Sequence, residues 1–153
     1  MKQVEREVAF AELMPLIDDA FRQGLTVTIT VTGNSMRPLF HHKRDSVVLS
    51  ACDPQALKRG DVPLYRRPNG QFVLHRIAKV LPDTYTLVGD AQSEREYGLP
   101  KTCVLAVMTG FIRNGKAVSC RNLWYRLYAA VWLWLRPIRP YIFACFRRLR
   151  GAR

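Results

Sequence analysis

The alternation of apolar and polar residues at the start of the chain predicts a helical segment followed by a strand. Between residues 3 and 23, apolar residues recur at three- and four-residue intervals, as on one face of an amphipathic helix. They are Phe10, Leu13, Met14, Ile17 and Phe21. Pro15 lies inside this pattern, so a kinked helix and two short helices are equally open, and Gly24 ends the segment. Residues 25–31 then alternate apolar side chains with threonine, which is typical of a half-buried strand.

Short apolar runs separated by Gly, Pro and Asn follow and predict a β-domain. Further strands are expected at residues 45–49, 61–65, 71–80, 84–88, 104–107 and 110–112, of which 71–80 is the longest. Residues 52–60 form a loop, and turn signals at residues 67–70 and 114–115 predict hairpins. Pro63 weakens its strand and indicates an edge or a bulge. The pattern predicts a mainly β fold: a small, curved, barrel-like domain.

The pattern changes at residue 123, where apolar residues begin to occupy nearly every helical face. The uncharged run 127–135 is far shorter than the roughly 20 residues needed to span a bilayer, and Pro137 and Pro140 break it. A second apolar patch, residues 141–146, precedes an Arg-rich end. Amphipathic helices lying in a membrane interface fit this pattern, and packing of the aromatic residues onto the β-domain is the alternative. The predicted divisions are an N-terminal helical segment (1–24), the β-domain (25–118) and a basic, apolar helical tail (119–153).

The charge of the chain is concentrated in that tail. The chain has 153 residues, 48% of them hydrophobic, and a formal net charge of +12, which describes one globular domain with an appendage. All twelve acidic residues lie at or before Glu96, and residues 97–153 contain 11 basic residues and no acidic one. Such a tail predicts an anionic partner: lipid headgroups, nucleic acid or an acidic protein.

The cysteines and the first residues bear on the compartment. Four cysteines occur without a C-x-x-C pair or a metal-like spacing, so we expect free thiols of a reducing compartment. The first seven residues are polar and lead to no apolar core of signal-peptide length. We therefore expect neither an export signal nor a membrane anchor at the front of the chain.

One serine lies where a nucleophile is easily presented. Ser35 follows the predicted strand 25–31, and Gly33 and Pro38 interrupt regular structure on either side of it. An ordinary strand-ending turn is the alternative for a lone G-x-S. A serine hydroxyl needs a base within hydrogen-bond reach to act as a nucleophile.

Three histidines are candidates for that base. His41 and His42 belong to a charged run after the serine turn, which is typical of solvated loop residues. His75 differs, because it lies within the predicted strand 71–80, where a fixed backbone holds a side chain accurately. An imidazole with an ordinary pKa of about 6.5 takes a serine proton and returns it to a leaving amine.

The serine turn and the residues downstream resemble the successive sequence boxes of the type I signal peptidase family, whose superfamily includes the LexA-like self-cleaving proteases. The boxes are residues 33–38 (GNSMRP), 45–49 (DSVVL), 58–62 (KRGDV), 73–77 (VLHRI) and 87–90 (LVGD). The resemblance covers residues 25–112. Its specificity lies in the combination of S-M-x-P with R-G-D-V and H-R at these distances.

The resemblance implies a serine endopeptidase with Ser35 as nucleophile and without metal or cofactor. His75 matches the histidine-base type of the endoplasmic reticulum and spore formers, whereas most bacterial members use lysine. An acid follows the Gly-Asp box in that type, and both Asp90 and Glu96 are candidates to orient His75. A structural turn residue beside Gly89 is the alternative for Asp90. The Ser35 backbone N–H is the expected oxyanion donor.

The residues around the nucleophile are expected to shape the oxyanion and substrate site. They are Gly33, Asn34, Met36 and Pro38. Many bacterial members have a hydroxyl residue two positions before the nucleophile. Gly33 occupies that position here, so side-chain help to the oxyanion is missing.

The resemblance also bears on localisation, because family members are generally anchored by an N-terminal transmembrane helix. Without one, we expect the β-domain at the cytoplasmic face of the membrane, held peripherally by the tail on anionic lipid, with integral attachment through the tail as the alternative. The expected substrate is a cytoplasmic peptide, such as the leader of a precursor peptide, or a protein delivered to the membrane.

Two other functions are open on the same fold. A catalytically inert module that binds a membrane or nucleic acid agrees with the basic tail and with Gly33; for the peptidase itself no nucleic acid is expected. A self-cleaving LexA-like regulator is disfavoured. Residues 1–24 are too few for a DNA-binding domain, and no lysine replaces His75.

Overall fold

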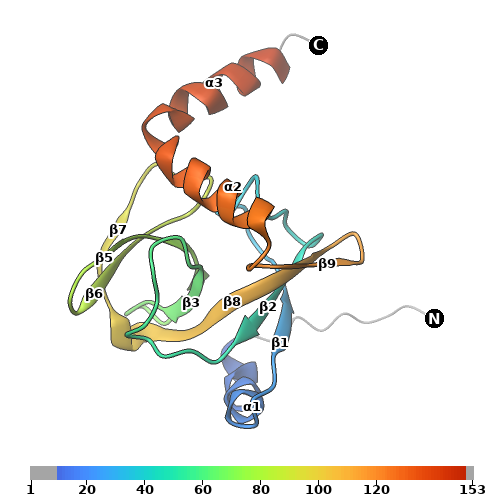
Figure 1. Cartoon of the computed structure of the whole chain (residues 1–153), viewed down its shortest axis with the longest axis vertical. Helices are drawn as coiled ribbons and strands as arrows, with labels where there is room; N and C mark the ends of the chain where they lie inside the picture. The colour runs from blue at the N-terminus through green and yellow to red at the C-terminus, as the bar shows by residue number, and fades with distance from the viewer. Residues whose placement is uncertain (1–9, 151–153) are drawn as a thin grey trace.

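The computed structural model describes residues 10–150 and is mainly β (Figure 1). Nine strands follow the N-terminal helix α1 (Phe10–Arg22). They are β1 (Val27–Thr30), β2 (Ser46–Ser50), β3 (Pro63–Arg66), β4 (Phe72–Leu74), β5 (Arg76–Val80), β6 (Thr84–Val88), β7 (Glu96–Pro100), β8 (Val104–Arg113) and β9 (Lys116–Ser119). The predicted fold class, a small curved β-domain between helical ends, is confirmed.

The strands form two antiparallel sheets. The larger sheet has the order β1-β2-β8-β3-β4, with β9 also paired to β8, and the smaller has the order β5-β6-β7. One apolar core lies under the larger sheet and includes Phe40, Val47 and Leu64. A second core, with Ile77 and Leu87, joins the smaller sheet to the larger. The sheets curl around these cores, and β1 and β4 stand at the two ends of the larger sheet.

The predicted strand 71–80 is wrong as a single element. The structure divides it into β4, which pairs with β3, and β5, which pairs with β6 in the other sheet. His75 is the residue between them, because the chain leaves one sheet there and enters the next. The longest strand is instead β8, whose ten residues join the two predicted strands 104–107 and 110–112.

Other differences follow from strand order. The sequence pattern did not predict β7. Of the edge or bulge expected at Pro63, the structure shows an irregularity and not an edge: β3 lies between β8 and β4, and its register with β8 shifts between Leu64 and Tyr65. Pro63 is tolerated there because it is the first residue of its strand. Both predicted hairpins are confirmed: β3–β4 turn through Gly70 (φ 86°), and β8–β9 through Asn114 (φ 50°) and Gly115 (φ 74°).

Helix α1 is continuous through Pro15, and residues 3–9 of the predicted helix lie outside the described residues. The helix packs on β1, and the Phe10 ring lies 4.9 Å from the ring of Phe72 in β4. One short helix therefore reaches both end strands of the larger sheet.

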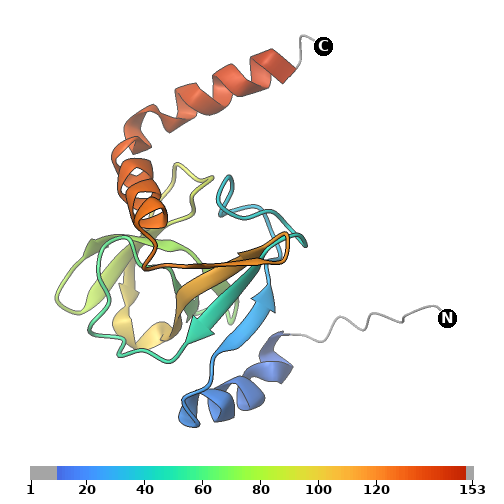
Figure 2. The ribbon, with the colours of Figure 1, turned by 45° about the vertical axis from the view of Figure 1, so that its right-hand side comes forward.

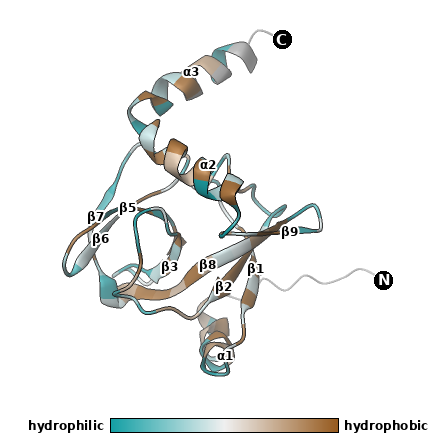
Figure 3. Ribbon diagram, in the orientation of Figure 1, coloured by the Kyte–Doolittle hydropathy of each residue, from teal (hydrophilic) through white to brown (hydrophobic). Residues whose placement is uncertain are grey.

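The tail forms α2 (Leu123–Trp134), a 3-10 turn η2 (Arg136–Ile138) and α3 (Arg139–Arg150), separated near Pro137 and Pro140 as predicted. Helix α2 lies across the β-domain, and α3 extends away from it (Figure 2). Apolar residues recur along α2 on more than one side (Figure 3). No helix in the described part of the chain has both the length and the apolar character that crossing a bilayer requires.

Candidate active site

Ser35 lies on the loop between β1 and β2, whose ends are joined by backbone hydrogen bonds. The Val31 N–H donates to the Asp45 carbonyl over 2.9 Å, and the Lys43 N–H donates to the Val31 carbonyl over 2.8 Å. Within the loop, the Gly33 N–H donates to Nδ1 of His42 over 2.9 Å. Gly33 has a φ of 97°, a conformation that favours glycine. These constraints present Ser35 on a defined turn.

The residue after Ser35 anchors this turn in the core. The Met36 side chain is 3% exposed and packs under the larger sheet, and its carbonyl accepts from the Phe40 N–H over 2.9 Å. The Met36 side chain is therefore a core residue rather than part of a substrate surface. Gly33, Asn34 and Pro38 are exposed beside Ser35.

Ser35 contacts the loop that follows β6, residues 89–93, which we call the 89–93 loop. The Ala91 N–H donates to the Ser35 carbonyl over 2.8 Å. Within the described residues, neither the Ser35 N–H nor its Oγ makes a hydrogen bond. Both groups are thus free to interact with a bound molecule.

His75 is buried and belongs to a chain of polar contacts. Its Nδ1 lies 3.1 Å from the Tyr65 hydroxyl and 3.7 Å from Oε2 of Glu96. The Tyr65 hydroxyl donates to that same Glu96 oxygen over 2.6 Å. Arg67 donates to both carboxylate oxygens of Glu96, each over 2.8 Å. Contacts therefore run from Arg67 through Glu96 and Tyr65 to His75.

This chain of contacts fixes the tautomer of His75. Hydrogen bonds from Arg67 hold the pKa of Glu96 below its ordinary value, so Glu96 is ionised and only accepts. The one hydroxyl proton of Tyr65 is donated to Glu96, and burial and Glu96 raise the pKa of Tyr65, so this proton is retained. Nδ1 must then carry the proton that it shares with Tyr65, which leaves Nε2 with its lone pair.

The position of Nε2 suits a base. Within the described residues, the hydrogen bonds of the His75 ring all involve Nδ1. Nε2 has no partner there and is not fully buried, so it reaches solvent. Burial lowers the pKa of His75 to about 4, and the charge of Glu96 opposes this only in part. The ring is therefore neutral near pH 7.

Asp90, the other predicted acid, is placed elsewhere. It is fully buried and its two carboxylate oxygens accept from Arg76 over 2.9 Å and 2.7 Å. Burial by itself lowers the pKa of Arg76, but the hydrogen bonds and charge of Asp90 outweigh it and raise the pKa. Of the two acids left open by the sequence, the structure brings Glu96 to His75 and gives Asp90 to Arg76.

Ser35 and His75 belong to one connected region but are not hydrogen-bonded to each other in the described structure. His75 precedes Arg76, which binds Asp90 of the 89–93 loop, and the next residue of that loop, Ala91, binds Ser35. Hydrogen bonds between catalytic groups are often long in substrate-free enzymes and tighten with substrate.

Sequence reasoning missed three residues of this region: Tyr65, Arg67 and His42. Tyr65 and Arg67 lie near His75 and Glu96 because β3 pairs with β4 and because β7 follows the 89–93 loop. No local motif marks these pairings. His42 did have a local signal, because a histidine next to a glycine turn is a ready hydrogen-bond acceptor. The sequence analysis nevertheless interpreted His42 as a solvated loop residue.

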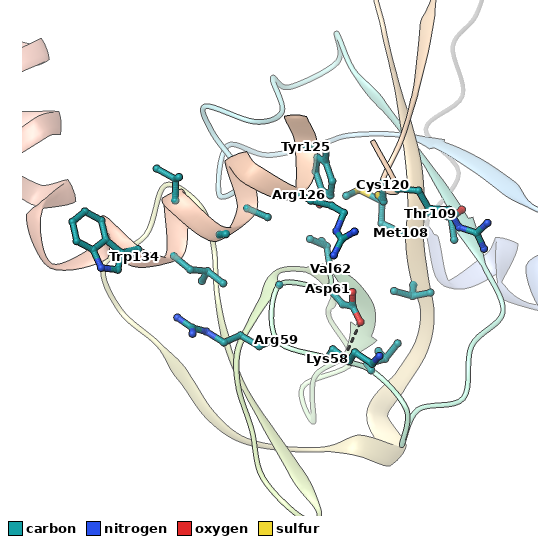
Figure 4. Close-up of a pocket in the computed structure, with 18 residues that line it drawn as sticks. Lys58, Arg59, Asp61, Val62, Met108, Thr109, Cys120, Tyr125, Arg126 and Trp134 are labelled. Carbon is teal, nitrogen blue, oxygen red and sulfur yellow. Dashed lines mark hydrogen bonds between the residues drawn. The ribbon is translucent and has the colours of Figure 1, made fainter. Parts of the chain in front are cut away.

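The comparisons with known proteins add no assignment. No family model matches the chain, and no curated protein is significantly similar to it. Among the described residues, no group of three His, Cys, Asp or Glu side chains is placed to hold a metal ion. A cavity of about 1080 Å³ lies between α2, β8 and residues 57–62, and neither Ser35 nor His75 lines it (Figure 4).

The close approach of Gly89 to the serine turn yields a first prediction. A Cβ at residue 89 would come 2.6 Å from the Ser35 carbonyl oxygen and 2.8 Å from Oε1 of Gln92. We expect Gly89→Ala to lower the free energy of unfolding by about 1–3 kcal/mol, because the 89–93 loop and the turn must separate. Urea denaturation measures this change.

A double variant separates the two contacts of that Cβ. Gln92→Ala removes the flexible side chain and leaves the Ser35 carbonyl in place. We therefore expect Gly89→Ala to lower the free energy of unfolding by as much in the Gln92→Ala protein as in the wild-type protein. Full recovery in the double variant would show that the backbone of Ser35 is not in close contact with residue 89.

Proposed function

We propose that the protein is a serine endopeptidase that resembles the type I signal peptidases of histidine-base type. In this proposal Ser35 is the nucleophile, His75 the general base and acid, and Glu96 the acid that acts on His75 through Tyr65. No cofactor or metal is required. The observation that carries the proposal is the His75–Tyr65–Glu96 chain, which leaves Nε2 of a buried, neutral imidazole unprotonated.

The reaction uses these groups in order. Oγ of Ser35 bonds to the scissile carbonyl carbon as its proton passes to Nε2 of His75, and the Ser35 N–H donates to the oxyanion. The carbon–nitrogen bond then breaks, and the proton moves from Nε2 to the leaving amine. Water repeats the sequence on the acyl-enzyme. The imidazolium formed in each step is stabilised by Glu96, whose negative charge reaches Nδ1 through Tyr65.

An extended peptide is the substrate that the sheet favours. β1 leads into the Ser35 loop and β4 leads into His75, and both are end strands of the larger sheet. End strands present unpaired backbone N–H and C=O groups, which bind an added strand. A leader or signal-type peptide that pairs with one or both strands would reach Ser35 and His75 at their ends.

Cleavage of a library of synthetic peptides, read by mass spectrometry, tests this function. We expect wild-type protein to cleave a subset of the peptides, and Ser35→Ala to cleave none of them. The matched control is Ser93→Ala, which alters an exposed serine of the 89–93 loop and should retain cleavage. A serine-directed acylating probe should modify Ser35 alone. Failure of both cleavage and labelling, or cleavage by Ser35→Ala, would refute the proposal.

A peripheral membrane location goes with this proposal, and it also supports the rival one. The tail exposes Trp124, Trp134 and Tyr141, each more than 70% exposed, next to basic residues. Anionic lipid is the partner that such a surface fits. Because Ser35 and His75 are not hydrogen-bonded in the described structure, an inert membrane-binding module is the second candidate function, and the labelling of Ser35 decides between the two.

A further inference from the structure

We propose that docking of helix α2 on an anionic lipid surface controls the Ser35 turn through the 89–93 loop. The inference rests on the proposed function, because it assigns a regulation to the same site. Its basis is that α2 combines an exposed apolar side with neighbouring residues that hold the loop in contact with Ser35.

The exposed side, which we call the outer face of α2, consists of apolar residues spaced by three, four and seven positions. They are Leu123, Trp124, Leu127, Val131 and Trp134. Trp124 is 77% exposed and Trp134 is 76% exposed. Residues at this spacing share one side of a helix, and a contiguous exposed apolar side marks an interaction site.

The charges around the outer face favour anionic lipid as the occupant. Four exposed basic side chains, of Lys58, Arg59, Arg121 and Arg126, and one carboxylate, of Asp61, line the cavity that α2 borders. Figure 4 shows Lys58, Arg59, Asp61 and Arg126 there. Residues 97–153 contain no acidic residue. Apolar and aromatic side chains flanked by cations are typical of helices that lie on a lipid surface. Nucleic acid is less suited, because the outer face includes aliphatic side chains that offer neither stacking nor hydrogen bonds.

Next to the outer face, two half-buried residues of α2, Tyr128 and Trp132, hold the 89–93 loop. Nε1 of Trp132 donates to the Asp90 carbonyl over 3.0 Å, and the Tyr128 hydroxyl donates to the Asp90 carboxylate over 3.3 Å. Beyond the helix, Arg139 donates to the Asp90 carbonyl over 3.3 Å, and Arg136 donates to the Ser93 carbonyl over 2.7 Å. The tail thus donates hydrogen bonds to the carbonyl groups of Asp90 and Ser93 in this loop.

The same loop fixes the nucleophile from its other side. Ala91 donates to the Ser35 carbonyl over 2.8 Å, and Gly89 has no room for a side chain beside that oxygen. Two hydrogen bonds, from Trp132 to Asp90 and from Ala91 to Ser35, therefore link α2 to the serine turn.

Docking affects this turn because a surface that binds the outer face stabilises the position of α2. A ligand shifts an equilibrium toward the state that it binds better. Lipid that binds the tail with α2 packed on the 89–93 loop therefore orders the loop and the Ser35 turn. Coupling between two sites is commonly worth roughly 5- to 150-fold in the property that is measured, and we expect a stimulation of about tenfold.

The test uses full-length protein with vesicles of phosphatidylcholine alone or with added phosphatidylglycerol. We expect sedimentation with the anionic vesicles only, a faster labelling of Ser35 by an acylating probe, and slower amide hydrogen exchange in residues 33–37 and 89–93. Leu127→Glu, on the outer face, should lose binding and stimulation while keeping its basal labelling rate. The matched control is Leu16→Glu, which alters an exposed leucine of α1 and should behave as wild type.

A second variant tests the coupling separately from binding. Trp132→Phe keeps a ring to stack on Tyr128, whose ring centre is 5.7 Å away, and removes the N–H that binds Asp90. It should bind the vesicles and show neither stimulation nor the change in exchange. Trp124→Phe, on the outer face, is its control and should retain both.

The outcomes separate this inference from the proposed function. If anionic vesicles slow the amide hydrogen exchange but neither labelling nor cleavage occurs, the proposed peptidase function is refuted and the coupling still holds. Labelling that is the same with and without vesicles, in protein that binds them, would refute the coupling alone. Binding to a DNA duplex that Leu127→Glu abolishes, without binding to vesicles, would assign the face to nucleic acid and refute the inference.

Discussion

Replacing His75 with glutamine is expected to lower the rate of peptide cleavage by about 10²- to 10⁴-fold, the usual contribution of a general base. Glutamine fills much of the space of the ring and can still meet the Tyr65 hydroxyl, but it takes no proton from Ser35. The variant is therefore expected to remain folded, with an unchanged circular dichroism spectrum. Rates are measured on the best peptide of the library, with active-site labelling as a second reading.

Tyr65→Phe is the matched comparison, because it removes one hydroxyl and leaves His75 in place. Nδ1 then loses the oxygen that it meets at 3.1 Å and with it the link to Glu96. We expect a smaller loss in kcat than for His75→Gln, with little change in KM.

A rate for His75→Gln within tenfold of wild type would exclude His75 as the base.

The pH profile examines the same arrangement. His75 must be unprotonated at Nε2 to accept the serine proton, so activity requires a pH above its pKa, which burial lowers to about 4. Cleavage is expected to persist from neutral pH down to about pH 5 and to be lost as the pH falls through about 4. A midpoint near the ordinary histidine value of about 6.5 would contradict the buried position of the ring.

The sequence singled out Ser35 and His75 because each choice depends on local features. Gly33 and Pro38 interrupt regular structure around Ser35, and His75 stands in an apolar run that had to be part of a sheet. Even the error at residues 71–80 is informative. Periodicity identifies apolar runs but not their partners, so it could not show that the run changes sheets at His75.

The acid could not be chosen in the same way. Asp90 and Glu96 lie six residues apart, and nothing local distinguishes a carboxylate that meets His75 from one that meets Arg76. The choice depends on strand pairing: β5 pairs with β6, and Arg76 lies opposite Val88, two residues before Asp90. Glu96 begins β7, an unpredicted strand, and meets Tyr65 and Arg67 of another sheet. Likewise, the hydropathy of the tail predicted helices but not that one side of α2 would hold the 89–93 loop.

The buried ion pair is where we expect the largest effect on stability. Arg76 and Asp90 are both fully buried, and the guanidinium also donates to the Gly60 carbonyl over 3.0 Å and to the Tyr125 hydroxyl over 3.2 Å. Asp90→Ala leaves this cation without a counter-charge in the interior. We expect it to lower the free energy of unfolding by about 3–5 kcal/mol, as measured by urea denaturation. Asp53→Ala, which removes an exposed carboxylate whose hydrogen bond is to the Gln55 N–H, should cost far less.

If Asp90→Ala does not fold, two further variants still test whether Arg76 and Asp90 form a stabilising buried ion pair. Arg76→Lys keeps the charge but loses the two-point contact with Asp90, so it should be destabilised less and remain folded. The pair Arg76→Met/Asp90→Leu removes both charges and should recover part of the loss, since uncharged residues of similar volume avoid the desolvation of a lone ion. A stable Asp90→Ala protein, within about 1 kcal/mol of wild type, would contradict the pairing.

Because Asp90 lies between Arg76 and Ala91, each destabilised variant should also react more slowly at Ser35. The segment from Asp90 to Glu96 thereby connects the stability of the fold to Ser35 and His75, the proposed catalytic pair.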